Sequence, residues 1–449
     1  MSANNPNLEP SLPSSDSGSG SSSSDSEGGS GYLAGGPISP VHEMPKVELA
    51  GSPYEIGLQH GTQLAPQILD QIRIYRDLFQ EACKFEWATV RKVAFEFQAS
   101  ISRLAPDLHN EMRGIADGVR AAQPGANPGV DILDIIALNA RSEIALGQWD
   151  DGCTALAWRI RTQDCHKQIL AQNWDWREGV GKNLAIATIS APGKPQIWMV
   201  IEVRPGRQAF LPRYNPIHVR SADRTERAFG SSGEPQPGIV GKIGFNSASV
   251  GVCLNAIRAR PISTSLLPIH LLLRIALECD SIDKAIESIE SLGGAASSQH
   301  ILIADKDGAR GLELSPRGAF YLKEDENGIL VHTNHFLENK LVDEPPWLSG
   351  SPIRLERAKT ICGELTQELG HERLGEIDAK LLRTRLFSDT VNSPQAICCS
   401  PDPNRVARIQ TLFNIVMTFE PGRAPCAEVI FGKPGSKEES GVYTGELSV

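Results

Sequence analysis

Two short stretches, Asp151-Gly152-Cys153-Thr154 and Gln172-Asn173-Trp174-Asp175, decide the fold and chemistry expected of this chain. A thiol that follows a glycine can attack the preceding peptide bond, because glycine has no Cβ and adopts the strained backbone that the attack needs. If the Gly152–Cys153 bond breaks, Cys153 becomes a terminus with both a thiol and an α-amine. The pKa of an α-amine is about 8, so it can act as the thiol's general base near neutral pH. No catalytic histidine would then be needed.

The same tetrapeptide also fits a tight turn followed by an inert thiol. Asp-Gly is a common turn dipeptide, and cysteine is often a small buried hydrophobic residue. The tetrapeptide alone therefore leaves both interpretations open, and other motifs along the chain decide between them.

A series of blocks favours the catalytic interpretation. They are Gly51-Ser-Pro-Tyr-Glu-Ile-Gly-Leu-Gln-His60-Gly, Asn139-Ala-Arg141-Ser-Glu143, Asp151 to Thr154, Gln172 to Asp175, Gly241-Lys-Ile-Gly-Phe-Asn246-Ser, Gly311-Leu-Glu-Leu-Ser315-Pro, His332-Thr-Asn334-His335 and Thr411-Leu-Phe-Asn414. With these blocks, in this order, the chain resembles the isopenicillin N acyltransferase family, the C45-type members of the N-terminal-nucleophile hydrolases. The resemblance extends from about Val47 to about Gly435.

The resemblance implies an α+β fold, the αββα four-layer sandwich of N-terminal-nucleophile hydrolases, and a set of site residues. Cys153 is the expected nucleophile, first for self-cleavage and then for acyl transfer through a thioester. Asp175 matches the family aspartate that holds and orients the new α-amine. Asn334 is expected to donate its amide N–H to the oxyanion. Arg408 is expected to stabilise negative charge or to hold Asp175.

Processing is expected at Gly152 and Cys153, and Ser315 matches a family serine implicated in it, although Ser-Pro alone also predicts a turn. The sequence departs from the β-lactam members at two sites. Thr154 is followed by Ala155 where those members carry a second threonine, and Ala407 replaces a serine. One hydroxyl that assists processing is therefore missing, and a seryl contribution from the second site is excluded.

Other polar residues of these blocks are expected to be structural. His332 and His335 are more readily structural or substrate-facing than metal ligands, since no third ligand is identifiable and the zinc-protease motif is absent. Arg141 and Glu143 are expected to form a buried structural pair. We therefore predict neither a metal nor a cofactor, and coenzyme A enters only as the carrier of a thioester substrate.

Composition excludes several classes of function. The 449 residues are 40% hydrophobic and carry a formal net charge of −10, which argues against nucleic acid or an anionic membrane as the main partner. Nine scattered cysteines indicate free thiols in a reducing compartment. No secretory signal or membrane span is visible, and the chain ends in Leu447-Ser448-Val449, unlike the peroxisomal Ser-Lys-Leu. We expect a cytoplasmic location.

Three segments are expected along the chain. Residues 1–45 are a Ser/Gly-rich disordered tail, 46–152 a mainly helical pro-segment, and 153–449 a catalytic subunit that shares one fold with it. Residues 204–237 form an arginine-containing insertion, read as a solvated loop with coenzyme A phosphate binding as the alternative. Strands are predicted at 47–49, 153–160, 168–174, 198–203, 243–255 (a hairpin), 301–304, 311–314, 319–322, 329–333, 412–419 and 426–431, and helices over most of 54–145 and at 266–278, 282–292, 355–369 and 378–387.

These features predict an autoprocessing cysteine enzyme that transfers an acyl group from an acyl-CoA or an amide to an amine. Water and amine attack the same thioester, so an amidohydrolase is an open alternative. An unprocessed, non-catalytic homologue is another. A papain-like protease is disfavoured, because its cysteine signature is absent. The expected partners are a small-molecule acyl donor and an amine acceptor, with the two fragments remaining associated after cleavage.

Overall fold

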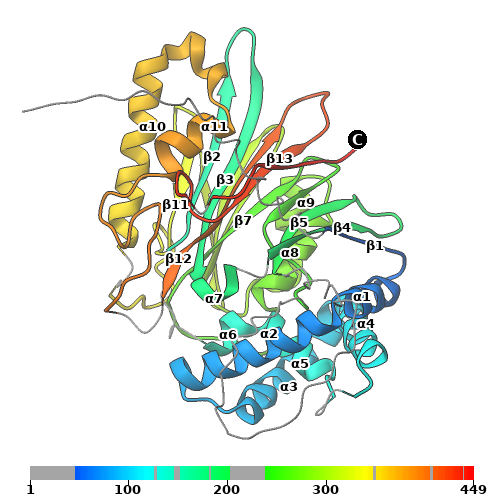
Figure 1. Ribbon diagram of the computed structural model, residues 1–449. Helices are drawn as coiled ribbons and strands as arrows, with labels where there is room; N and C mark the ends of the chain where they lie inside the picture. Colours follow the sequence, from blue (N-terminus) through cyan, green and yellow to red (C-terminus); the bar gives the residue numbers. More distant parts are fainter. Residues whose placement is uncertain are drawn as a thin grey trace, which may run out of the picture. The chain divides into compact units, whose positions relative to one another are not determined.

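The computed structural model describes residues 46–125, 129–145, 152–181, 184–202, 238–346, 350–404, 408–437 and 439–448. The predicted tail, the insertion at 204–237, Asp151 and Ala407 lie outside these ranges. Within them, two β-sheets and several helices make up a mixed α+β fold, which confirms the predicted class (Figure 1).

The larger sheet has eight strands in the order β1-β4-β5-β6-β7-β8-β9-β10. All neighbouring strands are antiparallel except β1 and β4, which are parallel. Its strands are β1 (Lys46–Ala50), β4 (Leu184–Ser190), β5 (Ile197–Glu202), β6 (Gly244–Asn246), β7 (Gly251–Ala256), β8 (Gln299–Asp305), β9 (Gly308–Ser315) and β10 (Gly318–Lys323).

The smaller sheet has six strands in the order β11-β2-β3-β12-β13-β14, all antiparallel. Because β2 begins at Thr154, Cys153 stands immediately before an inner strand of this sheet. Its strands are β2 (Thr154–Arg161), β3 (His166–Arg177), β11 (Ile329–His332), β12 (Ile409–Phe419), β13 (Cys426–Phe431) and β14 (Tyr443–Glu446).

The two sheets pack face to face, with helices on the outer faces (Figure 1). Phe245 of the larger sheet and Phe419 of the smaller meet in the core, with ring centroids 6.4 Å apart. Gln172 of β3 exchanges two hydrogen bonds with the backbone of Leu254 in β7, at 2.6 and 3.1 Å. The outer helices are α8 (Ile269–Leu277) and α9 (Ile282–Ser291) on the larger sheet, and α10 (Ser351–Arg373), α11 (Ala379–Leu382) and the π-helix Arg383–Phe387 on the smaller.

Residues before the proposed cleavage site are mainly helical, as predicted. Ser52 caps the first helix in a capping box with Glu55. Gly57 and Gly61 of α1 lie so close to α4 that an added Cβ would come within 1.9 and 2.1 Å of its backbone oxygens, so only glycine permits this packing. The helices are α1 (Pro53–Gln63), α2 (Ala65–Leu78) with the π-turn Phe79–Cys83, α3 (Trp87–Leu104), α4 (Pro106–Ala122), α5 (Ile132–Asn139) and α6 (Arg141–Ala145).

This helical region is joined to the rest of the fold by buried polar contacts. β1 extends the larger sheet by pairing with β4. Arg274 of α8 makes two hydrogen bonds, each 3.0 Å, with the carboxylate of Glu111 in α4, and both side chains are 1% exposed. Glu143 accepts hydrogen bonds from the Ile269 N–H and the Ser297 hydroxyl, at 3.0 and 2.8 Å.

Element boundaries differ from the predictions at identifiable residues. α8 begins at Ile269 and not at 266, because Pro268 is its N-cap and lacks the N–H of a helix interior. α10 begins at Ser351, four residues before the predicted start at 355. β4 and β14 were not predicted, although Leu184–Ser190 is rich in β-branched and aliphatic residues.

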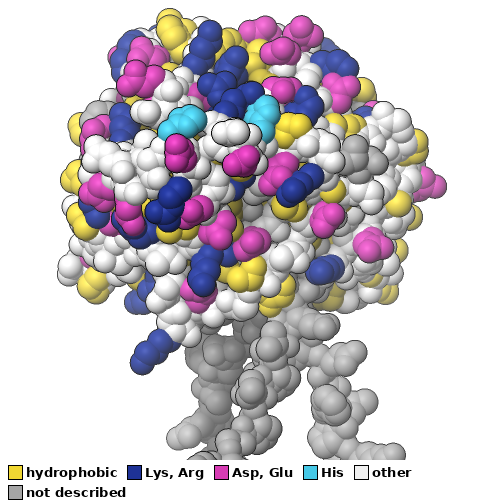
Figure 2. All heavy atoms as spheres, turned by 90° about the horizontal axis from the view of Figure 1, so that it is seen from above, with side chains coloured by type: hydrophobic (Ala, Val, Ile, Leu, Met, Phe, Trp, Pro, Cys, Tyr) yellow, Lys and Arg dark blue, Asp and Glu magenta, His cyan; other side chains and the backbone are white. Residues whose placement is uncertain are grey.

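The described surface carries charges of both signs. On the face drawn in Figure 2, Lys and Arg side chains are interspersed with Asp and Glu. In the described ranges, every helix is either too short or too polar to cross a lipid bilayer.

Candidate active site

Cys153 follows Gly152 and directly precedes the first residue of β2. Its side chain is buried, at 2% exposure. The Asp175 backbone N–H donates to Sγ at 3.4 Å, and Sγ lies 3.7 Å from the Asp175 carbonyl oxygen. The thiol is therefore fixed against β3 beside Asp175, and the two motifs that opened the sequence analysis meet here.

The Asp175 carboxylate lies against Gly152. A Cβ added to Gly152 would come within 2.6 Å of Asp175 Oδ2 and 3.2 Å of Asp175 Cβ. Any side chain larger than hydrogen would thus displace the carboxylate. The structure provides a reason for glycine at this position that is separate from backbone strain: it admits a carboxylate beside the Gly152–Cys153 bond.

The other carboxylate oxygen of Asp175 is held from β12. The Thr411 hydroxyl donates to Asp175 Oδ1 at 2.6 Å, and both residues are fully buried. The same hydroxyl oxygen accepts the Cys399 N–H at 2.9 Å. Thr411 lies directly opposite Asp175 in the β12–β3 pairing, immediately before a shift in register.

Arg354, on the first turn of α10, forms the opposite side of the site. One guanidinium nitrogen donates to the Cys153 carbonyl at 2.6 Å and to the Thr154 hydroxyl at 3.1 Å. Another donates to Asn334 Oδ1 at 2.8 Å. Its side chain is buried, so a permanent positive charge lies within hydrogen-bond distance of the Cys153 carbonyl group.

Asn334 is brought to the site by the segment after β11. Its Nδ2 donates to the Ala256 carbonyl at 3.0 Å, and its backbone N–H donates to the Ser351 hydroxyl at 2.7 Å. Since Oδ1 accepts from Arg354, the orientation of the amide is fixed on both sides. A carboxamide nitrogen has two hydrogens, and the bond to Ala256 uses one.

A small cavity of about 20 Å³ adjoins Cys153. This is close to the volume that one water molecule requires, so the described residues leave little room beside the thiol. Trp174, Trp176, Leu254 and Ala256 form its apolar wall, and Arg141, Ser142, Lys242 and His270 its polar part. Burial, together with the nearby charges of Arg141 and Lys242, lowers the pKa of His270 well below its usual value.

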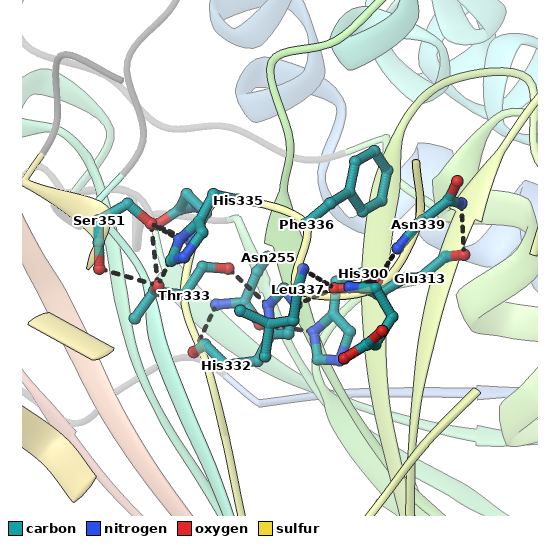
Figure 3. A network of polar contacts seen from close by, with 12 residues as sticks. Asn255, His300, Glu313, His332, Thr333, His335, Phe336, Leu337, Asn339 and Ser351 are labelled. Carbon is teal, nitrogen blue, oxygen red and sulfur yellow. Dashed lines mark hydrogen bonds and ion pairs between the residues drawn. The ribbon is translucent and has the colours of Figure 1, made fainter. Parts of the chain in front are cut away.

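A buried polar network lies behind the site (Figure 3). Asn255 donates to the Cys153 carbonyl at 3.2 Å, and its Oδ1 pairs with His300 Nδ1 at 3.0 Å. His300 stacks on His332, with ring centroids 3.4 Å apart. His332 Nε2 in turn pairs with Glu313 at 3.0 Å.

Glu313 fixes the loop that follows Asn334. Its carboxylate accepts backbone N–H groups from Leu337, Glu338 and Asn339 at 2.5, 2.9 and 2.7 Å. Burial alone raises the pKa of Glu313, but the hydrogen bonds from His332 and these backbone groups outweigh it, and the net pKa is lowered. The Glu313 carboxylate therefore fixes the segment that follows Asn334.

His332 and His335 both pair with other buried side chains of the protein. His335 Nδ1 pairs with the Ser351 hydroxyl at 2.8 Å, and burial, with the charges of His332 and Arg354, lowers its pKa to about 4. In the ranges that the structure covers, no three His, Cys, Asp or Glu side chains are grouped to hold a metal ion. All nine cysteines are free thiols.

The structure does not bring Arg408 or Ser315 to the thiol. The Arg408 side chain is 60% exposed and pairs with Glu178 at 2.7 Å, whereas Asp175 is held by Thr411. The Ser315 hydroxyl donates to the Gly318 carbonyl at 2.9 Å and accepts from Arg317, which corresponds to the turn interpretation. Arg141 and Glu143 are both buried; Arg141 donates to the Leu138 carbonyl, and Glu143 accepts from Ile269 and Ser297. Burial raises the pKa of Glu143, and the nearby charge of Arg141 opposes this rise.

Sequence reasoning missed Arg354, Thr411 and Asn255. One signal could have found Arg354: it stands four, seven and eleven residues before Ala358, Ile361 and Leu365, on the buried face of α10. Thr411 belongs to a quoted motif, but no role follows from a lone threonine in a strand. Asn255 gives no signal of this kind.

Most of the chain is similar to known proteins. A family model described as acyl-coenzyme A:6-aminopenicillanic acid acyl-transferase matches residues 160–435. The chain is 31% identical, over 405 residues, to the acyl-coenzyme A:6-aminopenicillanic-acid-acyltransferase 40 kDa form of Emericella nidulans, covering 89% of this chain and 96% of that protein. A crystal structure of a variant of conjugated bile acid hydrolase from Clostridium perfringens aligns with 66% of this chain and 97% of its own, at 11% identity and a TM-score of 0.39.

Proposed function

Because this chain belongs to the acyl-coenzyme A:6-aminopenicillanic acid acyl-transferase family, we propose that it cuts itself before Cys153 and then transfers acyl groups through a Cys153 thioester. The observation that carries the proposal is the contact of Gly152, Cys153 and Asp175: the thiol lies on Asp175, and the Asp175 carboxylate lies against Gly152. In this proposal the layered sheets are those of an N-terminal-nucleophile hydrolase.

The proposed self-cleavage has two steps. Sγ of Cys153 bonds to the carbonyl carbon of Gly152, the C–N bond to Cys153 breaks, and the nitrogen takes the thiol's proton. Water then hydrolyses the resulting thioester, which leaves a carboxylate on Gly152 and restores the thiol. Residues 1–152 and 153–449 become separate fragments, and movement of the new Gly152 terminus would enlarge the cavity beside Cys153.

In the cleaved form, the α-amine of Cys153 is the proposed base and Asp175 its partner. A carboxylate at this position favours and orients the ammonium form. When the thiolate attacks an acyl donor, the ammonium is already in place to protonate the leaving group. The burial of Asp175 and its bond from Thr411 support this role, because a fixed carboxylate holds the amine in a single orientation.

Asn334 is the proposed oxyanion donor, and Arg354 is proposed to position it. Rotation of the Asn334 amide is restricted by Arg354 on its oxygen and Ala256 on its nitrogen. A preorganised donor of this kind stabilises the tetrahedral intermediate without reorganisation during the reaction. Arg408 and Ser315 remain candidates from the family resemblance, although their side chains pair with Glu178 and with the Gly318 carbonyl.

The proposed substrates are an acyl donor, either a coenzyme A thioester or an amide, and an amine acceptor. The relative from Emericella nidulans is named for acyl-coenzyme A and 6-aminopenicillanic acid, and we take both as the first probes. No cofactor is needed for thioester exchange. Water competes with the amine for the same intermediate, so hydrolysis is the alternative outcome.

We further propose that the two fragments stay associated. The parallel pairing of β1 with β4 and the buried Arg274–Glu111 pair both connect residues before Gly152 to residues after it. Cytoplasmic location stays a prediction, which an N-terminal fluorescent fusion would check.

Turnover is tested on protein that has already been cleaved. Acyl-CoAs of increasing chain length are offered with and without 6-aminopenicillanic acid, and release of the coenzyme A thiol and formation of the amide are followed separately. Amide formation supports transfer, and thiol release without amine supports hydrolysis. Cleaved protein that releases no thiol from any donor, and whose Cys153 does not become acylated, would contradict the proposed function.

A further inference from the structure

We propose that Thr411 is a positioning residue for Asp175, and that its hydroxyl determines which carboxylate oxygen faces the N-terminal amine of Cys153. This inference rests on the proposed function, because it assigns a role within the same site. It concerns a residue that touches neither the thiol nor the scissile bond in the contacts of the described residues.

The Thr411 hydroxyl has two close partners of opposite kind, and the Cys398 thiol also faces it. The hydroxyl accepts the Cys399 N–H at 2.9 Å and lies 2.6 Å from Asp175 Oδ1. The Thr411 backbone N–H donates to the Cys399 carbonyl at 3.1 Å, so the two residues are bonded reciprocally. Thr411 and Asp175 are fully buried, and Cys399 is 5% exposed.

The direction of the short bond follows from these partners. A hydroxyl has one hydrogen and two acceptor lone pairs. Since a backbone N–H can only donate, Cys399 occupies a lone pair, and the hydroxyl proton remains for Asp175. A separation of 2.6 Å is typical of an O–H donor on an ionised carboxylate.

The two oxygens of Asp175 are thereby given separate roles. Oδ1 is bonded to Thr411, and Oδ2 faces Gly152, where an added Cβ would stand 2.6 Å away. After cleavage, the nitrogen of Cys153 becomes an amine next to the position that Gly152 occupied. Thr411 therefore fixes the carboxylate plane so that Oδ2 is presented to that amine, and its hydrogen bond favours the ionised form.

The test compares Thr411→Val, which keeps the shape and removes the hydroxyl, with Thr411→Ser, which keeps the hydroxyl. Thr418→Val is the matched control. Thr418 lies in the same strand, is partly exposed and pairs with Cys426 at the start of β13. Each variant is checked by thermal melting and for cleavage. The rate of alkylation of Cys153 by iodoacetamide is then measured against pH, by mass spectrometry of the peptide 153–159.

We expect Thr411→Val to slow alkylation about 10–100-fold near neutral pH, by analogy with the effect of removing hydrogen-bond partners of metal-binding side chains. The acidic limb of its pH profile should move to higher pH, because a carboxylate that has lost a donor is protonated more readily. Thr411→Ser should restore both the rate and the limb, and Thr418→Val should match the wild type. A purely structural role would lower the rate equally at every pH.

The outcomes separate this inference from the proposed function. If wild-type protein is not cleaved at Cys153, the proposed function fails. If the wild type is cleaved and Thr411→Val is folded, cleaved and alkylated with the wild-type profile, only the role of Thr411 fails. A folded Thr411→Val that stays uncut, while Thr411→Ser is cut, supports the inference at the processing step.

Discussion

Two arginines lie in contrasting regions of the molecule. Arg354 is buried and bonds to the Cys153 carbonyl, the Thr154 hydroxyl and Asn334. Arg408 is 60% exposed, directly precedes β12 and pairs with Glu178, which is 44% exposed. Motif resemblance identified the exposed arginine, whereas the fold brings the buried one to Cys153. For these two arginines, the position of Arg408 next to a motif predicted contact with Cys153 less well than the position of Arg354 on the buried face of α10.

The two arginines should contribute differently to the free energy of unfolding. Buried acceptors that lose a charged donor keep the full cost of desolvation, which is about 1–3 kcal/mol per group. An exposed ion pair contributes only about 0.2–1 kcal/mol. Replacing Arg354 by methionine should therefore lower the free energy of unfolding much more than replacing Arg408 by methionine.

Arg354→Met should have the largest effect. It removes the donor to three buried acceptors, so we expect the free energy of unfolding to fall by about 3 kcal/mol or more. Urea titration of an uncut Cys153→Ala background measures this loss without interference from cleavage. An unchanged unfolding midpoint would contradict the importance given to the buried arginine.

Asn334→Ala tests the catalytic partner of Arg354. If Asn334 donates to the oxyanion, kcat should fall roughly 10²–10³-fold, as for other oxyanion donors. The assay is thioester turnover by protein already shown to be cleaved, because processing attacks the Gly152 carbonyl and can use another donor. Near wild-type kcat in that sample would remove Asn334 from the site.

Glu313→Gln tests the acid that anchors the Asn334 loop. An amide has one acceptor oxygen and brings an N–H group against three backbone donors, so we expect a loss of about 1.5–3 kcal/mol near neutral pH. Because the folded-state pKa of Glu313 is lowered, its stabilising contribution is present above the usual glutamate pKa of about 4.3 and is lost as the pH falls through the folded-state value.

The difference between wild type and Glu313→Gln in urea titrations should therefore shrink as the pH falls below that range. Glu178→Gln, in the exposed region, is the control and should cost about 1 kcal/mol or less. A difference that grew on acidification would contradict the role given to the Glu313 carboxylate.

Arg408→Met should have the smallest effect, a loss of stability of about 0.2–1 kcal/mol that decreases with salt. If turnover fell as far as in Asn334→Ala, Arg408 would have to reach the site in a form that this structure does not present. That result would restore the role implied by the family resemblance and weaken the contrast with Arg354.

Features that depend on residues close together in the sequence could be predicted. The helices over 54–145, the strands on either side of the turn near Asp164 and the caps at Asp131 and Ser281 follow from local patterns, and the structure confirms them. Cys153 and Asp175 were paired because their motifs are separated by one hairpin, and they do meet.

What could not be predicted depends on contacts between distant parts of the chain. Arg354 reaches Cys153 across 201 residues, and Thr411 reaches Asp175 across 236. The only local signal for Arg354 is its place on the buried face of α10, and nothing local distinguishes Thr411 from any other strand threonine. Their roles arise only when α10 covers the smaller sheet and β12 pairs with β3.

The measurement that tests the central claim most directly is the identity of the new N-terminus. Purified wild-type protein and Cys153→Ala are compared by denaturing gel, intact mass and N-terminal sequencing. We predict that the wild type yields two fragments, one ending at Gly152 and one beginning at Cys153, which co-elute under native conditions, and that Cys153→Ala stays in one piece. Fully active wild-type enzyme that remains a single uncut chain would contradict the account.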